Sequence, residues 1–250
     1  MLNPFRPLGN ALRDMFDEFL IVIVCNVLWC LFSLPLFWVA YTLLGFGSPI
    51  IATIVALLAV LPAGPATAGL YYVMHRVFEA RAIKVSDFFV GLRQFARQGW
   101  VVFGIWVIGL LFILFDLGFY SQSSGALAAI ILGIWIYALL LWLAMMLYAF
   151  PLVFMQEQPD LRLVARNAAL MTIGRPVFTL ITLLLMLVIT IFSVALILPF
   201  LLITVALLSL WSFRVTRTVV DDAQRRRNEA EGVNQPAPEE KGRKGQVRPK

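Results

Sequence analysis

Few polar side chains lie inside the long apolar stretches of this sequence, and they are the first candidates for chemistry. The candidates for a substrate or ion site are Asn26, Gly64, Pro65, Thr67 and Asp116. An ionisable group inside a membrane segment is a functional candidate by default. We therefore consider two roles for Asp116. It takes part in proton or substrate transfer, or it is a structural group that reaches water, because it lies near the outer rim.

The stretch LPAGPATAGL, residues 61–70, interrupts an apolar run with two prolines and two glycines. Each proline lacks an N–H, so carbonyl groups near residues 58–61 should lose their helical partners. Gly64 and Pro65 could start a half-helix whose N-terminus points into the membrane, and such ends bind ions or anionic groups in transporters. The prolines expected to interrupt helices are Pro35, Pro62, Pro65 and Pro199.

Asn26 is the expected partner for this break. An amide in lipid needs hydrogen bonds, and helical rise places Asn26 and Thr67 about 10 and 13 Å inside the same membrane surface. We expect Asn26 to bond the backbone freed at 61–67. Two interpretations remain open. The contact either packs two helices together, or it belongs to a substrate or ion site.

No paired carboxylates, Ser/His/Asp set, metal-ligand cluster or phosphate-binding loop occurs in the sequence. We therefore expect no enzymatic activity, no cofactor and no metal ion.

The elements that position these residues follow from composition and charge. Apolar residues make up 61% of the chain and charged residues 14%, whereas soluble domains have about 45–50% and about 25%. Runs of about 20 apolar residues indicate membrane-spanning helices. The sequence predicts an all-α, polytopic transmembrane bundle. Its six spans are expected at 20–44, 49–74, 100–120, 126–152, 176–196 and 199–214.

The apolar run 176–213 decides whether the chain has five or six spans. As one helix it would extend about 57 Å, nearly twice the thickness of the hydrocarbon core. Two short spans hinged at Leu198-Pro199 place every cluster of Lys and Arg on one side, while the connections 45–48 and 117–125 carry none. Basic loops stay cytoplasmic, so both termini are expected in the cytoplasm of a multi-pass plasma-membrane protein.

Three segments flank the spans. A cytoplasmic N-terminal segment covers 1–18, the transmembrane domain covers 19–215, and a basic, disordered cytoplasmic tail covers 216–250. Its arginines are expected to contact anionic lipid: Arg214, Arg217, Arg225, Arg226 and Arg227. These charges follow the membrane plane without an aromatic-basic groove, so we expect no nucleic-acid partner.

Two cytoplasmic loops, 79–98 and 156–175, show helical spacing of apolar residues with arginines opposite. Each predicts an amphipathic helix in the membrane surface. The two share L-R-x-x-A-R at 92–97 and 161–166, which is weak support for a duplicated unit. The loops are either interfacial helices held by the lipid bilayer or a docking surface for a soluble partner.

A set of residues resembles the YesL-like family of bacterial membrane proteins of unknown function. The residues are Asn26, Trp29, Ser33-Leu34-Pro35, Gly64, Thr67, Ala68, Tyr71-Tyr72, Asp87-Phe88-Phe89, Arg93, Phe95, Asp116 and Tyr120. The resemblance covers about 10–215. The chain departs from short members by the 28 residues, 36–63, between its S-L-P and G-x-x-T elements, and by Gln94 in place of an asparagine.

The resemblance implies an accessory role in carbohydrate uptake, with ABC-type sugar-uptake components contacting the loops 79–98 and 156–175. A small transporter or channel in its own right, or a structural or assembly factor of the membrane, are the alternatives. A polar cavity at Asn26, Thr67 and 61–65 would favour the transporter, and a dry, packed bundle would favour the structural factor.

Overall fold

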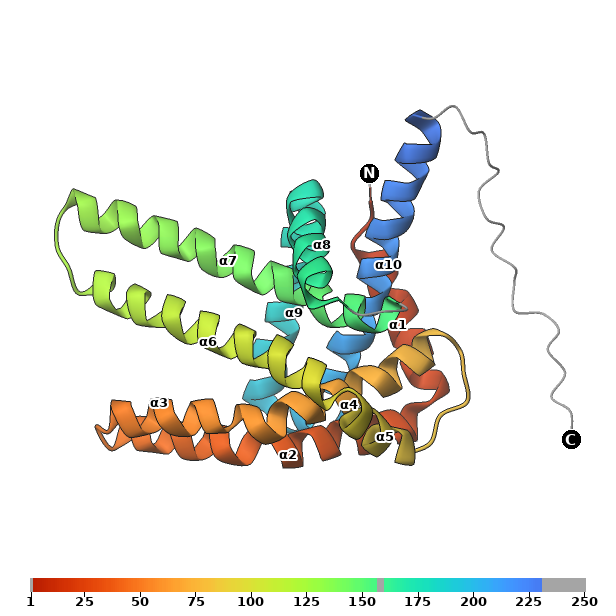
Figure 1. Ribbon diagram of the computed structural model, residues 1–250, viewed down its shortest axis with the longest axis horizontal. Helices are drawn as coiled ribbons and strands as arrows, with labels where there is room; N and C mark the ends of the chain where they lie inside the picture. Colours follow the sequence, from red (N-terminus) through yellow and green to blue (C-terminus); the bar gives the residue numbers. More distant parts are fainter. Residues whose placement is uncertain (1, 157–159, 231–250) are drawn as a thin grey trace, which may run out of the picture.

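The computed structural model describes residues 2–156 and 160–230, which fold as helices joined by short connections (Figure 1). The elements are α1 Phe5–Asp17, α2 Phe19–Gly45, α3 Pro49–Leu58, α4 Val60–Phe78, α5 Ser86–Gln94, α6 Ala96–Ser121, α7 Ala126–Met155, α8 Leu161–Gly174, α9 Pro176–Leu196, the π-helical turn η1 Phe200–Thr204 and α10 Val205–Ala230.

Among these described residues, six helices are long and apolar enough to cross a membrane. They are Phe19–Gly45, Pro49–Phe78, Ala96–Ser121, Ala126–Met155, Pro176–Leu196 and Phe200–Glu229. The predicted all-α class and the predicted spans are confirmed, except that the last helix continues well beyond residue 214. The protein is a helical, multi-pass membrane protein by the length and composition of these helices.

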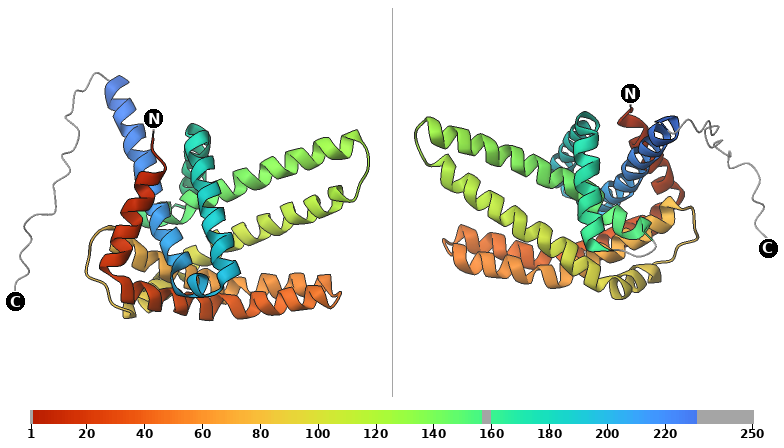
Figure 2. Two further views of the ribbon diagram at one scale, coloured as in Figure 1. Left: turned by 180° about the vertical axis from the view of Figure 1, so that it is seen from behind. Right: turned by 45° about the horizontal axis from the view of Figure 1, so that its top comes forward.

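The spans pair into three hairpins. α2 runs beside α3 and the first part of α4, and α6 pairs with α7 (Figure 1). α9 and α10 form a third hairpin, which runs across the other two in each view (Figure 2). α4 lies at the crossing, because it contacts α2, α5, α6, α7 and α10.

The third hairpin confirms the predicted division of 176–213. α9 ends at Leu196, and Ile197 takes φ 60° and ψ −57°, which reverses the chain. Pro199 then precedes η1. A β-branched residue at positive φ is strained by about 1–2 kcal/mol. The residues after the turn pack in η1 against α9 and α2, and these contacts hold it.

Aromatic side chains fill the core where α4, α7 and α10 meet. The ring of Tyr71 stacks on Phe150 with centroids 4.7 Å apart and lies 5.8 Å from Phe213. Elsewhere large apolar side chains face outward, such as Trp38 at 68% and Phe115 at 73% exposure. A continuous apolar outer surface of this kind is what a bilayer covers.

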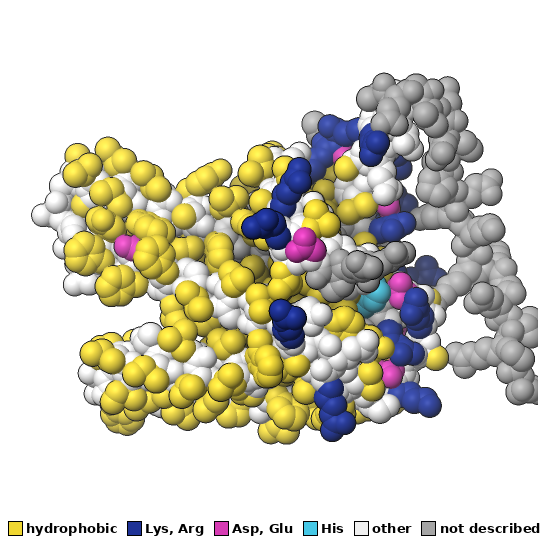
Figure 3. All heavy atoms as spheres, viewed as in Figure 1, with side chains coloured by type: hydrophobic (Ala, Val, Ile, Leu, Met, Phe, Trp, Pro, Cys, Tyr) yellow, Lys and Arg dark blue, Asp and Glu magenta, His cyan; other side chains and the backbone are white. Residues whose placement is uncertain are grey.

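Charge divides the molecule into two ends. Lys and Arg side chains gather over α5, α8 and α10, whereas the closed ends of the first two hairpins are largely apolar (Figure 3). This is the distribution expected if the basic clusters share one side of a membrane.

One prediction about the flanking segments needs correction. Residues 216–230 are helical rather than disordered, because Val215 and Val219 are buried and Arg217–Asp221 and Arg226–Asp222 form i,i+4 pairs along α10. The remaining tail, 231–250, lies outside the described residues. The N-terminal segment forms α1, which packs Ala11 and Met15 inward beside α10.

The two loop helices occur as α5 and α8, but protein covers their inner faces. Phe88 of α5 and Val164 of α8 are buried, and a Cβ on Gly91 would lie 2.5 Å from the Cβ of Tyr72 in α4. The shared L-R-x-x-A-R gives no repeat, because 92–97 crosses from α5 into α6 while 161–166 opens α8.

Candidate functional site

Asn26 is fully buried and hydrogen-bonds α10 rather than the 61–67 backbone. Its Nδ2 donates to the carbonyl oxygens of Phe200, at 3.0 Å, and Leu201, at 2.7 Å. Its Oδ1 accepts from the backbone N–H of Ala206 at 2.9 Å. The predicted hydrogen bond from Asn26 to 61–67 is therefore wrong, and Asn26 instead joins α2 to η1 and α10, the last span.

The reason lies in the π-helical turn η1. A π turn pairs C=O of residue i with N–H of residue i+5, which would join Leu201 to Ala206. The amide of Asn26 stands between these two groups and bonds both of them. A side-chain amide has an acceptor oxygen and two N–H donors, like a peptide unit with one additional donor. It therefore supplies the hydrogen bonds that the π turn leaves unmade, which lipid could not supply.

Trp29 makes the contact that was expected of Asn26. Its Nε1 donates to Thr67 Oγ1 at 3.0 Å, and Thr67 in turn donates to the carbonyl of Ala63 at 2.7 Å. This chain of bonds ties α2 to α4. Thr67 is therefore a packing and hydrogen-bonding residue within the described fold.

The proline-rich stretch 61–65 does not break the helix. α3 ends at Leu58 and α4 begins at Val60, so the only interruption of this span, within its described residues 49–78, is at Ala59, before the stretch. Pro62 lies in the first turn of α4, where its missing N–H leaves no bond of α4 unmade. The half-helix end predicted at Gly64 and Pro65 is therefore wrong. Pro35 likewise lies within α2 without ending it, whereas Pro199 does stand at a chain reversal.

The carbonyl freed by Pro65 finds a partner on another helix. Pro65 cannot donate to Leu61 four residues earlier, and the indole Nε1 of Trp100 in α6 donates to Leu61 O at 2.8 Å. Next to this bond, α6 and α4 approach through glycines. A Cβ on Gly99 would lie 2.5 Å from Gly64 O, so small residues set this close approach, as predicted for 61–70.

Asp116 lies near the C-terminal end of α6 and is half-buried. Its Oδ2 is buried without a hydrogen-bond partner among the described residues, as is the hydroxyl of Ser33 in α2. The other candidate residues lie on α2 and α4. The structure therefore does not bring Asp116 together with Asn26 or Thr67 in one site through any hydrogen bond described here.

The arginines of α10 differ from one another. Arg214 is partly buried, pairs with Asp14 of α1, and holds its guanidinium carbon 4.8 Å from the centre of the Phe78 ring. It therefore anchors α1, and its lipid contact stays a prediction. Arg217 pairs with Asp221 and Arg226 with Asp222. These two, with Arg225 and Arg227, stay exposed, and their lipid contact remains a prediction.

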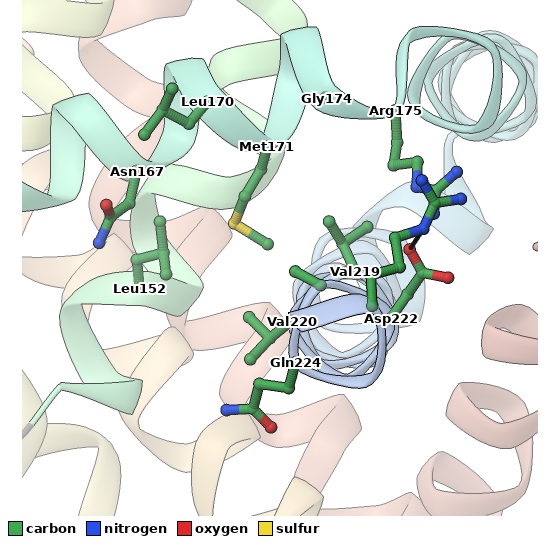
Figure 4. A pocket seen from close by; sticks show the side chains of 12 residues that line it. Leu152, Asn167, Leu170, Met171, Gly174, Arg175, Val219, Val220, Asp222 and Gln224 are labelled. Carbon is green, nitrogen blue, oxygen red and sulfur yellow. Dashed lines mark hydrogen bonds and ion pairs between the residues drawn. The ribbon is translucent and has the colours of Figure 1, made fainter. Parts of the chain in front are cut away.

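Three cavities of about 370–400 Å³ lie at the charged end, and none is lined by Asn26, Thr67 or the 61–65 stretch. The first separates α8 from α10 above Leu152 of α7 (Figure 4). Met171 extends from α8 toward Val220 of α10, and Arg175 pairs with Asp222 beside them. The second is rimmed by acidic residues of the α1–α2 junction.

Sequence reasoning missed several of these contacts. The bond from Trp100 to Leu61 had a partial signal, because Pro65 leaves the carbonyl of Leu61 without a helical partner and a buried indole N–H needs an acceptor. Asp14 and Arg214 lie 200 positions apart, and no local pattern links them. The sequence holds one residue that fits the π turn, Thr204, whose hydroxyl donates to the carbonyl oxygen of Pro199 five residues earlier, at 2.9 Å.

A comparison with known families finds one match, to a family described as protein of unknown function, DUF624, over residues 22–117. No curated protein and no solved structure matches the chain. The matched segment runs from α2 into α6 and holds Asn26, Trp29, Thr67 and Asp116. Over its first three spans, the chain is similar to this family of unknown function.

Proposed function

We propose that this chain is a non-enzymatic accessory component of a bacterial uptake system, carbohydrate uptake in the first instance, in the plasma membrane. In this proposal it acts by contact between its cytoplasmic face and an ABC-type permease or ATPase. The orientation of the chain in the membrane is part of the proposal. The end that carries α5, α8 and the second half of α10 faces the cytoplasm.

The observation that carries this proposal is how the polar groups of the spans are used. The amide of Asn26, the indoles of Trp29 and Trp100, and the hydroxyl of Thr67 all bond groups of the protein itself. Such contacts hold helices together. A transport pathway would instead need some of these groups to face a cavity.

The charged end offers the surface for a partner. Arg93 and Arg97 near α5, and Arg162 and Arg166 on α8, are exposed. They belong to the loops 79–98 and 156–175, and the two arginines of α8 share that helix with the exposed apolar residues Leu163, Leu170 and Ile173. Exposed arginines around apolar side chains are typical of protein interfaces. The choice of carbohydrate uptake rests on the resemblance to the YesL-like family.

Affinity capture from native membranes tests the proposal. The tagged full chain should retain a sugar-uptake permease or ATPase, and the variant Arg162→Glu with Arg166→Glu should lower its yield at least about fivefold, because charge reversal opposes complementary contacts. Arg225→Glu with Arg227→Glu makes the same charge change on α10 and serves as the control. Capture without any uptake component, or equal loss in both variants, would contradict the proposal.

One observation favours the transporter alternative. Asp116 Oδ2 is buried and has no partner among the described residues, and an ionisable group in a span is a candidate for ion or proton transfer. The structural or assembly-factor alternative predicts the same packed interior as the accessory role, and the captured partner separates these two.

A further inference from the structure

The cavity between α8 and α10 combines two kinds of lining. Its apolar part is formed by Leu152, Leu170, Met171, Val219 and Val220. Its polar edge is formed by Asn167, Arg175, Asp222, Gln224 and Arg226 (Figure 4). The cavity volume is about 380 Å³. A ligand that fills it needs an apolar portion and a polar headgroup on the same molecule.

The polar edge carries a net positive charge. Asp222 pairs with Nη2 of Arg175 from the α8–α9 junction and, at 3.3 Å, with Nε of Arg226 one turn along α10. Two guanidinium groups face one carboxylate, so the group has a formal charge of +1. Each guanidinium has five N–H donors, and Asp222 engages one nitrogen of each. Planar guanidinium groups of this kind recognise phosphate.

Arg175 also lines the third of the cavities described above, which has a volume of about 370 Å³. This cavity shares Gly174 and Arg175 with the first and is otherwise lined by apolar residues of α9 and the N-terminus, including Phe178 and Ile181. Val177 beside it is 69% exposed. Apolar lining therefore lies on both sides of the Arg175 charge.

The position of Arg175 in the chain places these cavities at a membrane surface. It directly precedes Pro176, the first residue of the span Pro176–Leu196, whose mean hydropathy is 2.8. A basic residue at the start of a span lies at the level of lipid headgroups, and basic pockets between helices on the cytoplasmic side bind anionic headgroups. Acyl chains would then meet the exposed apolar surface of α9.

We propose that the α8–α10 cavity binds an anionic phospholipid, with the phosphate at Arg175 and Arg226 and an acyl chain against the apolar lining. The phospholipid ties α8 to α10, which the cavity otherwise separates. This site shares Arg226 with the arginine cluster expected from the sequence, and it adds Arg175, which lies outside that cluster, and the apolar lining of the cavity. It is also independent of any protein partner.

The test uses the purified full chain in detergent, stripped of lipid, with three probes: phosphatidylglycerol, phosphatidylcholine and inorganic phosphate. Phosphatidylglycerol should raise the melting temperature and remain bound in native mass spectrometry, because a ligand that binds the folded state stabilises it. Phosphatidylcholine and inorganic phosphate should do neither at the same concentration.

Two variants locate the site. Arg226→Gln leaves the Arg175–Asp222 pair in place and should weaken phosphatidylglycerol binding about tenfold, the value of one charge-assisted contact. Ala223→Phe adds bulk at the cavity lining without changing charge and should also weaken binding. Arg162→Gln makes the same charge change at an exposed position of α8 outside the cavity and should bind as the natural chain does.

Three results would overturn the proposal. Equal retention of phosphatidylglycerol and phosphatidylcholine would show general detergent-like binding. Stabilisation by inorganic phosphate alone would indicate a soluble phosphate site rather than a lipid site. Equal binding by Arg226→Gln and Arg162→Gln would place the lipid elsewhere. If Ala223→Phe does not fold, the comparison of the two arginine variants still decides.

Discussion

Asn26 in α2 and Ala206 in α10 lie 180 positions apart, and the backbone N–H of Ala206 donates a 2.9 Å hydrogen bond to the Asn26 side chain. The same amide donates to Leu201 O at 2.7 Å. One side chain therefore completes the π turn at the start of the last span. This contact joins the first and last spans. Inside a membrane no water is present to bond the same backbone groups if the contact is lost.

Replacing Asn26 by Leu should destabilise the protein by about 2 kcal/mol, because it leaves buried backbone groups of η1 and α10 without partners. Thermal unfolding in detergent measures the effect. Ser33→Ala is the control on the same helix, since Ser33 is equally buried but its hydroxyl has no partner among the described residues. Ser33→Ala should be neutral, and equal melting of both variants would refute the role of Asn26.

Gly99→Ala should destabilise the protein by about 1–3 kcal/mol, the range of overpacked interiors. The added Cβ would lie 2.5 Å from Gly64 O, so α4 and α6 would have to move apart. Gly118→Ala, farther along α6, meets no atom within 4 Å and should be neutral or stabilising by up to about 1 kcal/mol. Chemical denaturation in mixed micelles compares the two, and a harmless Gly99→Ala would disprove the close approach.

Trp100→Phe should cost about 1 kcal/mol by removing the hydrogen bond to Leu61 O. Pro65→Ala restores a backbone donor for the same carbonyl. In the Pro65→Ala background, therefore, the cost of Trp100→Phe should fall to less than about half. The free energies of unfolding of the four chains give this coupling, and the same cost in both backgrounds would mean that the indole does not serve the carbonyl that Pro65 leaves free.

The sequence predicts the spans well because apolar run length and basic clusters are direct physical requirements of a bilayer. It also predicts the reversal near Pro199, since a 57 Å helix would not fit. Contacts between helices are harder. Asn26 and Thr67 have matching depths, yet Asn26 bonds α10 and Trp29 bonds Thr67. Depth fixes which residues share a layer of the membrane, and the rotation of each helix selects the partner within that layer.

The end of α10 shows a second limit. Composition predicted a disordered tail from 216, because 221–230 holds almost no apolar residues. Buried Val215 and Val219, and ion pairs spaced four residues apart, keep the helix intact to Ala230. A composition argument averages over the segment and misses that spacing.

Asp116→Asn should leave the melting temperature unchanged, because Asp116 lies near the end of α6 and makes no hydrogen bond described here. In proteoliposomes with an imposed membrane potential and a trapped pH dye, the natural chain and the variant should match empty liposomes. Proton flux in the natural chain that Asp116→Asn abolishes would replace the accessory role with the transporter alternative.

The most direct test of the account is a map of which loops face the cytoplasm. In a background without Cys25 and Cys30, single cysteines are placed at Ser123, Ala82 and Glu229, and intact cells are treated with a membrane-impermeant maleimide. Residue 123 lies in the α6–α7 connection, residue 82 between α4 and α5, and residue 229 at the end of α10. With the charged end in the cytoplasm, position 123 should be labelled in intact cells, and positions 82 and 229 only after the cells are permeabilised. Labelling of 82 or 229 in intact cells would contradict this orientation.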